Sequence, residues 1–271
     1  MRSLRVLLAI VSTVALTACI NSTTLIKLKA DGSGTVEQTT LMNVAALKSF
    51  APGADKQMGG VNKADLERTA TRMGKGVRLV SAEPFKGANG FEGSKAIFAF
   101  DDINQIQVSQ GPSMGGSMGG STDGRMSPEP TPEDPVKFTL TRTGGTSTLT
   151  IAFIDQPGGA GKADPGANPM AGMDLTNPMM MGMIKSMFAG FKINIDLEVA
   201  GAIVKTNAEY VTGSRLTLLE MDMDSLLADE AKLKALQGKL GPDASLSAIK
   251  PYLEDIKGIK VDGPTISVEF K

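Results

Sequence analysis

The residues best suited to bind something are a cluster of methionines. Five of the chain's 16 methionines lie within nine positions, between Met179 and Met187. If a helix begins at Pro178 with Asn177 as its cap, then Met179, Met183 and Met187 are four residues apart and line one side. Thioether sulfurs are suitable ligands for soft ions such as copper(I) and silver(I). This spacing is the basis of a soft-metal hypothesis, although the chain has no histidine to strengthen such a site.

The same segment supports two other interpretations. Between Met179 and Phe191 only Lys185 and Ser186 are polar, so a helix here is apolar nearly all round, and such helices are buried or contact lipid. Flexible Met side chains fill irregular apolar space, which suits a lid over a hydrophobic ligand. The candidate residues for that role are Met179, Met180, Met183, Ile184, Met187 and Phe188. Plain core packing is the third interpretation, and an apolar stripe by itself favours it most.

Other residue types that carry chemistry are few. The chain has no His and a single Cys, Cys19, which excludes Ser/His/Asp and Cys/His catalytic sets. Carboxylate pairs at Asp101-Asp102 and at Asp222 and Asp224 offer acid/base or hard-cation chemistry. Turn and helix-start roles explain these acids more simply. We therefore expect no catalytic residues, no cofactor and no enzyme activity.

The first residues predict export and lipidation. A short basic region precedes the apolar run Val6–Leu16, which is too short to span a bilayer but suits a secretory signal peptide. The run ends in "LTAC", which resembles a bacterial lipobox. The resemblance implies a signal peptide over residues 1–18, cleavage before Cys19, and acylation of Cys19 with palmitate-like chains. Acyl chains of this kind would anchor the mature protein to a lipid bilayer.

The residue after the anchor and the net charge bear on location and partners. Ile20, not Asp, follows Cys19, and for Gram-negative lipoproteins this implies the outer membrane, facing the periplasm. Loss of the signal peptide removes Arg2 and Arg5, so the formal net charge changes from −1 to −3. No basic face emerges from the sequence, so we expect no nucleic-acid partner.

Hydrophobic alternation predicts single-faced strands. The clearest case is "VKFTLTRTGGTSTLTIAFI" (residues 136–154), where a Gly144-Gly145 turn sets the register of a hairpin. That register pairs Val136 with Phe153, Phe138 with Ile151, Leu140 with Leu149, and Thr139 with Thr150. Residues 191–199 also alternate strictly, with Ile195 and Leu197 on the apolar face and Asp196 on the polar face. A slip by one residue would reverse these faces.

The remaining elements follow from the same patterns. Strands are expected in a hairpin over 24–42 and within 76–85, 90–103, 201–222 and 265–271. Helices are expected over 44–50, 63–73, 225–237 and 248–256. For the second of these, Asn62 provides a cap and Gly74 a stop signal.

Strands with helices between them predict an α+β fold, with a largely antiparallel sheet and several helices. Two flexible insertions rich in Gly, Pro and Met, near 110–135 and 156–168, are expected to be disordered. We expect a short tether over residues 19–23 and a single domain over 24–271. Two domains that divide near the first insertion are the alternative.

Several stretches resemble a loose group of bacterial envelope lipoproteins, including the mycobacterial LppM-like type, whose function is poorly defined. Besides the anchor Cys19, they are "LKADGSGTVEQTTLM", "GFEGSKAIFAFDDI" and "VKTNAEYVTGSRLTL", which together cover about half of the mature chain. The resemblance implies an α+β envelope domain that binds lipid-like molecules. The Gly/Met-rich insertion departs from that pattern.

These observations lead to one main functional hypothesis and two alternatives. The main hypothesis is a non-enzymatic, membrane-anchored envelope lipoprotein that binds a lipid-like ligand or a partner protein of the envelope. The alternatives are soft-metal binding through the methionine cluster, and a purely structural interaction module.

Overall fold

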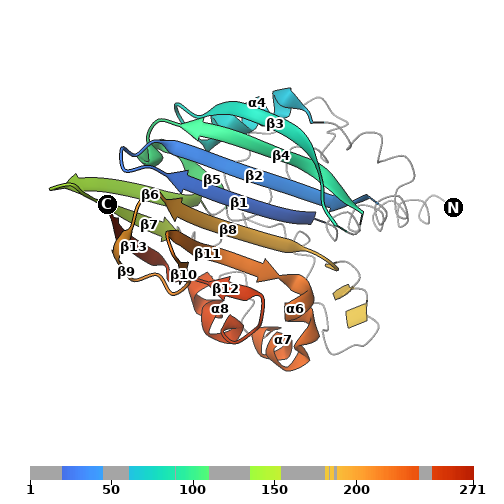
Figure 1. Ribbon diagram of the computed structural model, residues 1–271. Helices are drawn as coiled ribbons and strands as arrows, with labels where there is room; N and C mark the ends of the chain where they lie inside the picture. Colours follow the sequence, from blue (N-terminus) through green and yellow to red (C-terminus); the bar gives the residue numbers. More distant parts are fainter. Residues whose placement is uncertain are drawn as a thin grey trace, which may run out of the picture.

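The structure is a computed structural model, and it describes residues 20–44, 61–88, 90–109, 135–153, 181–182, 184–185, 188–237 and 246–271. In this part of the chain the strands form two sheets (Figure 1). The larger sheet has eight strands in the order β10-β11-β8-β1-β2-β4-β3, with β12 paired to β11. Its strands are β1 (Ile20–Leu28), β2 (Gly34–Asn43), β3 (Arg78–Lys86), β4 (Phe91–Phe100), β8 (Lys192–Val199), β10 (Val211–Thr212), β11 (Arg215–Asp222) and β12 (Ile259–Val261).

The smaller sheet has five strands in the order β5-β6-β7-β13-β9. They are β5 (Gln107–Ser109), β6 (Pro135–Thr143), β7 (Thr146–Phe153), β9 (Ile203–Thr206) and β13 (Thr265–Phe270), and a short 3-10 helix, η1 (Ile103–Gln105), precedes β5. One apolar face of each sheet contributes to the same cluster of buried side chains. Its members include Ile26, Phe98 and Leu197 from the larger sheet and Phe138, Ile151 and Phe270 from the smaller. The two sheets therefore pack face to face and close the core between them.

The fold is mostly β. The structure describes four α-helices, α4 (Lys63–Met73), α6 (Met223–Ala228), α7 (Glu230–Gln237) and α8 (Leu246–Leu253). Among the described strands only β1 and β8 pair in parallel, so the prediction of a largely antiparallel arrangement is confirmed. The predicted α+β class overestimates the contribution of helices to the fold. Because the sheets close the core themselves, the helices cover only its margins, with α4 beside β3 and β5 and α8 beside β12.

Both predicted hairpins are present. In β6–β7 the register pairs Val136 with Phe153, Phe138 with Ile151, Leu140 with Leu149 and Thr139 with Thr150, as predicted. The turn residues Gly144 and Gly145 have φ of +59° and +85°, which only glycine adopts at little cost. The hairpin β1–β2 turns at Gly32, with φ of +82°.

The start of β1 corrects the predicted tether. The strand begins at Ile20, which pairs with Met42, whereas the sequence placed the first strand at residue 24 and a tether over 19–23. Residues 21–23 are polar and show no alternation, so their side chains gave no strand signal. Their backbones nevertheless pair with β2 on one side and β8 on the other.

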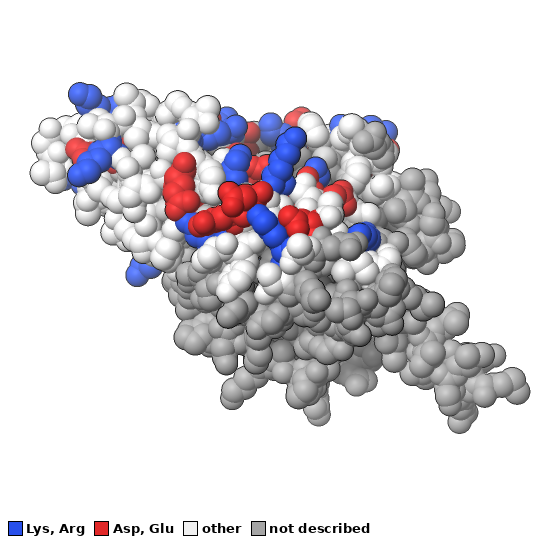
Figure 2. All heavy atoms as spheres, turned by 90° about the horizontal axis from the view of Figure 1, so that it is seen from below, with Lys and Arg blue, Asp and Glu red and all other residues white. Residues whose placement is uncertain are grey.

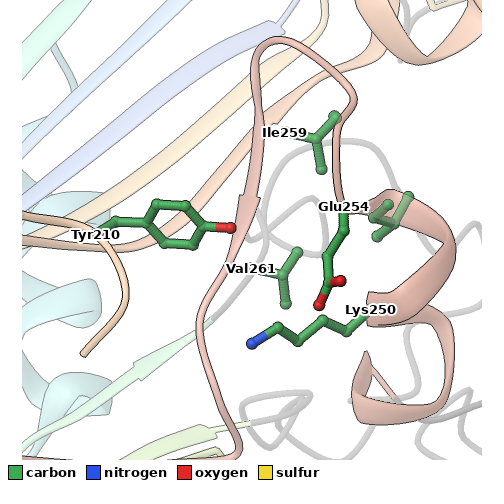
Figure 3. Close-up of a pocket in the computed structure, with 6 residues that line it drawn as sticks. Tyr210, Lys250, Glu254, Ile259 and Val261 are labelled. Carbon is green, nitrogen blue, oxygen red and sulfur yellow. The ribbon is translucent and has the colours of Figure 1, made fainter. Parts of the chain in front are cut away.

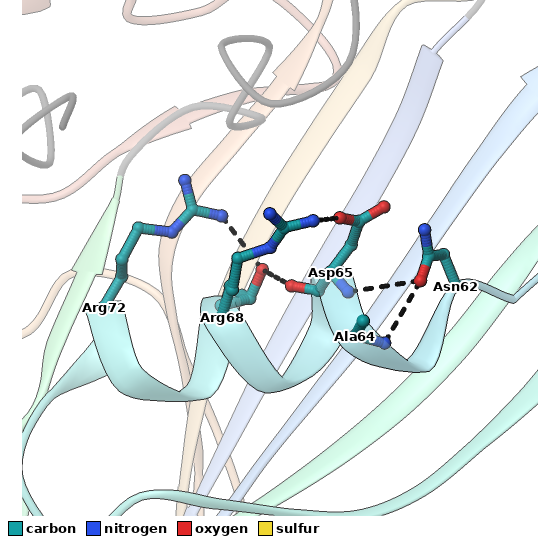
Figure 4. Close-up of polar contacts among 6 residues, drawn as sticks. Asn62, Ala64, Asp65, Arg68 and Arg72 are labelled. Carbon is teal, nitrogen blue, oxygen red and sulfur yellow. Dashed lines mark hydrogen bonds and ion pairs between the residues drawn. The ribbon is translucent and has the colours of Figure 1, made fainter. Parts of the chain in front are cut away.

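Helix α4 confirms its predicted bounds and cap (Figure 4). The Asn62 side-chain oxygen accepts hydrogen bonds from the backbone N–H groups of Ala64 (3.1 Å) and Asp65 (3.4 Å). The helix buries Ala70 and Met73 and ends at Gly74. On its exposed side Arg68 pairs with Asp65 and Arg72 donates to Thr69, which are solvated contacts of small energetic value.

The single helix predicted over 225–237 is two helices, α6 and α7. The break is at Asp229, whose backbone N–H closes α6 on the carbonyl of Leu226 and whose carboxylate accepts the N–H of Lys232. A residue that can cap a helix therefore interrupts the apolar period. The predicted helix over 248–256 corresponds to α8, which contains Pro251.

Apart from single residues at their ends, the predicted helix over 44–50 and the insertions near 110–135 and 156–168 lie outside the described residues.

Candidate functional site

The candidate site lies at one end of the larger sheet, which we call the entry end. There β1 and β8 begin, β2 and β3 end, and β4 begins, as the strand registers show. The residues that define it are Ile20, Asn43, Lys86, Phe91 and Lys192. In Figure 1 this end lies to the right, and the C-terminus lies to the left.

The methionine segment leads into β8 at the entry end. Of its predicted site residues, Ile184 and Phe188 are described, whereas Met179, Met180, Met183 and Met187 lie outside the described residues, as does Cys19. The Ile184 side chain is 1% exposed and belongs to the main hydrophobic cluster. Met181 and Phe188 are partly buried and pack against that cluster. Core packing is therefore the role of Ile184 in the structure.

A tight turn fixes the end of this segment. The Phe188 N–H donates to the Ile184 carbonyl (2.9 Å), which is a helical hydrogen bond, and the Phe191 N–H donates to the Phe188 carbonyl (3.1 Å). Between them Gly190 has φ of +75°, and its N–H donates to both carboxylate oxygens of Asp224 at 3.0 Å. The segment is thereby held against the start of α6, more than thirty residues further along the chain.

Aromatic rings gather around this turn. The rings of Phe188 and Phe191 meet edge to face with centroids 6.1 Å apart. A Cβ on Gly190 would lie 3.3 Å from the ring of Phe91, so glycine allows that ring to approach from β4. Phe85, on the neighbouring strand β3, is 40% exposed. The entry end thus combines buried, half-buried and exposed apolar side chains.

Charged side chains at the entry end occur in pairs. Lys192 contacts Asp222 at 2.6 Å, and Lys86 contacts Glu92 at 3.3 Å. The hydrogen bond that Lys192 donates to the Asp222 carboxylate, helped by the nearby Asp224 and Glu220 charges, raises the pKa of Lys192 above its ordinary value against the effect of burial. Lys192 therefore stays charged at neutral pH, and the pairs give this end no strong charge of either sign.

The four acids singled out in the sequence have structural roles at element ends. Asp222 accepts the N–H groups of Asp224 and Ser225 and caps α6. Asp102 caps η1 in the same way by accepting the N–H of Asn104, and Asp101 pairs with Arg78 at 2.9 Å. Within the described ranges no three His, Cys, Asp or Glu side chains are grouped so that they could hold a metal ion.

A second polar cluster lies beside α8 and was not predicted. Tyr210, Lys250 and Glu254 point toward a shallow hollow whose wall includes Ile259 and Val261 (Figure 3). The hollow encloses no space for even a water-sized molecule, whereas pockets for ligands of drug size hold roughly 300–1,000 Å³. It is therefore too small to enclose a lipid-like molecule.

Ionic contacts explain the polar residues around this hollow. Lys250 pairs with Glu209, and although burial opposes the charged form, this contact raises the pKa of Lys250. Asp262 is 4% exposed and accepts the N–H groups of Glu209 (3.1 Å) and Gly263 (2.7 Å). Burial raises the pKa of Asp262 and, with the Glu209 charge, that of Tyr210. These residues come from three distant segments, so no spacing in the sequence could reveal the cluster.

Strand β8 contains buried polar atoms of Asn194 and Asp196, and the alternation in the sequence did not predict their burial. Asp196 lies on the polar face as predicted, but it is only 7% exposed because β8 is a central strand between β1 and β11. One of its carboxylate oxygens lies 3.8 Å from Arg215, and the other, like the side-chain oxygen of Asn194, has no hydrogen-bond donor.

Two further observations concern the surface and membranes. Seen from the side of α7 and α8, acidic and basic side chains are interspersed (Figure 2). No helix within the described ranges combines the length and the apolar character that crossing a membrane requires.

The chain shows little similarity to known proteins. No protein-family model matches the chain, and no curated protein sequence matches it. Among solved structures, the chain is similar to the folded domain of LppM from Mycobacterium tuberculosis, determined by NMR. The alignment has 11% identity and a TM-score of 0.35 and covers 94% of this chain and 91% of that one.

Proposed function

We propose that this chain is a lipid-anchored protein of the bacterial envelope that acts without catalysis and binds a lipid-like ligand or a partner protein at the entry end. The bilayer anchor is acylated Cys19. In a Gram-negative cell the domain faces the periplasm from the outer membrane. The proposal depends on the "LTAC" sequence and on the apolar side chains of the entry end.

One observation carries the proposal. The strand that follows Cys19 begins at the same end of the sheet as the strand that follows the methionine segment, because β1 and β8 pair in parallel from Asn21 and Lys192 onward. An anchor at Cys19 and an apolar segment that ends at Phe191 are therefore neighbours. This geometry supports hydrophobic binding next to a membrane.

The first test is native mass spectrometry of the mature chain with Cys19→Ser, purified from a periplasm without detergent. Ile20 must be retained, since it pairs with Met42 in β1–β2. A co-purifying adduct of lipid mass supports the proposal. A bare protein that also binds no added phospholipid contradicts ligand binding and leaves a protein partner as the remaining form of the proposal.

Substitutions then assign the adduct to a site. Met180→Asp with Phe188→Asp should abolish the adduct while the circular dichroism spectrum is retained. Because Phe188 packs against the core, Met180→Asp alone provides a second, gentler variant. An adduct that persists in both folded variants contradicts a role for this segment.

A further variant separates a ligand role from the soft-metal hypothesis. Replacing Met179, Met183 and Met187 by Leu keeps apolar volume and removes sulfur, so lipid binding should survive. A copper- or silver-sized mass shift after loading, lost in this triple variant, would instead favour the metal.

A further inference from the structure

The phenylalanines divide into two groups by burial. Nine of the ten lie in described residues, and five of these are core side chains, namely Phe98, Phe100, Phe138, Phe153 and Phe270. The other four are exposed or half-buried, and all four lie at the entry end, namely Phe85, Phe91, Phe188 and Phe191. A single exposed apolar side chain needs no explanation, but several partly exposed rings at one place form an apolar surface of the kind that marks an interaction site.

The larger sheet begins at the residue that directly follows Cys19. Ile20 is already paired in β1, and β1 lies between β8 and β2 in the interior of the sheet. Consecutive Cα atoms are about 3.8 Å apart, so an anchor on the residue that precedes Ile20 would be close to the start of β1. Acyl chains on Cys19 would therefore bring this end close to the membrane surface.

The chemistry of the entry end suits a bilayer interface. Phe85 is 40% exposed at the end of β3, and Lys86 beside it has a side chain that is 79% exposed. Partly exposed aromatic rings next to long cationic side chains are typical of residues at the headgroup level of membranes. Because Lys86 and Lys192 are paired with Glu92 and Asp222, apolar contact outweighs attraction to anionic lipid.

We infer that the entry end is the surface that lies against the bilayer, with Phe85 inserted at the headgroup level and the strands of the larger sheet pointing away from the membrane. This inference rests on the proposed lipid anchor. It adds to that proposal the orientation of the domain and the residues that contact lipid.

Strand β3 provides a matched pair of positions. Val80 and Phe85 are both exposed apolar residues on the same edge strand, at 60% and 40%, and they are five positions apart. At about 3.3 Å per residue they are roughly 16 Å apart along the strand. The headgroup layer is only about 5–8 Å deep on each side of the hydrocarbon core. An upright domain therefore places Phe85 in the membrane and Val80 outside it.

The chain has no Trp, so a single introduced indole reports its own surroundings. The experiment uses the full-length lipidated protein in phosphatidylcholine vesicles, with either ordinary or brominated acyl chains. The variants are Phe85→Trp, Val80→Trp and, in the smaller sheet, Val204→Trp, which replaces a residue that is 51% exposed. Mass spectrometry of the Cys19 peptide establishes the acylation of each sample.

The expected result is a blue shift and bromine quenching for Phe85→Trp and neither effect for Val80→Trp or Val204→Trp. Equal quenching at Phe85 and Val80 in the acylated protein means that the sheet lies flat, and absence of quenching at Phe85 means that the entry end stands off the membrane. Either outcome overturns this inference and leaves the proposed anchor intact. A Cys19 peptide without acyl groups overturns both.

Discussion

At the residue scale, charged side chains of the larger sheet form ion pairs between neighbouring strands. On its outward face Glu37 lies between two lysines of neighbouring strands, 2.5 Å from Lys27 and 3.5 Å from Lys95. The hydrogen bond from Lys27, together with the charges of both lysines, holds the pKa of Glu37 below its ordinary value of 4.5. The folded state therefore binds this proton less tightly than the unfolded chain does, and stability gains from the ionised form.

We predict that Glu37→Gln lowers the free energy of unfolding at pH 7 by roughly 0.5–1 kcal/mol, the upper range for partly exposed ion pairs. The contribution is fully present above pH 4.5 and is lost as the pH falls through the lowered pKa of the folded state. Urea unfolding of both proteins from pH 7 to pH 3 measures the difference. Glu67→Gln, which removes an exposed contact of 3.9 Å with Lys63, is the control and should change little. A difference that persists at low pH would contradict the ionic origin.

At the element scale, turn chemistry sets the register of β6–β7. Both turn glycines have positive φ, and no atom lies within 4 Å of a Cβ built on either, so backbone conformation alone requires them. Positive φ at both central residues is typical of a type I′ turn, which prefers Asn-Gly as well as Gly-Gly. A substitution at this turn therefore tests the backbone conformation and not side-chain packing.

We predict that Gly144→Val destabilises the protein by about 1–2 kcal/mol, the cost of a left-handed β-branched residue, whereas Gly144→Asn is nearly neutral. For a chain of this size each kcal/mol corresponds to about 2–4 °C in Tm. Thermal unfolding followed by circular dichroism gives both values. Equal losses in the two variants would show that the turn is not the left-handed one described here.

At the scale of the whole molecule, Ile184 connects the methionine segment at the entry end to the core. Ile184 is 1% exposed and shares the hydrophobic cluster with residues of both sheets. Phe85, at the same end, is exposed. Substitutions at these two positions therefore distinguish a core-packing role from a surface-contact role within the same region.

We predict that Ile184→Ala costs about 2–4 kcal/mol of stability, as is usual for truncation of a buried aliphatic side chain. Phe85→Ser should change stability by at most about 0.5 kcal/mol, because a surface substitution removes little packing. Urea unfolding of the mature chain with Cys19→Ser measures both. A small effect for Ile184→Ala would mean that the segment rests loosely on the sheets, which would favour a lid over core packing.

The sequence by itself determined the local features of this protein. The register of β6–β7, the bounds of α4 and the helix-start role of Asp222 follow from turn glycines, caps and alternation, each of which acts over a few residues. It also indicated Cys19 as an anchor, which remains a prediction. Those signals are local because backbone conformation and capping hydrogen bonds are decided by near neighbours in the chain.

Only the tertiary structure decided which strands meet outside the two hairpins. Alternation shows which face of a strand is apolar, but it does not select a partner, so the parallel pairing of β1 with β8 and the second sheet could not be derived from it. The same limit hid the burial of Asp196 and the cluster around Lys250 and Asp262, whose members come from distant segments. The gathering of Phe85, Phe91, Phe188 and Phe191 at the entry end has the same origin, because it depends on strand order and direction and not on spacing in the chain.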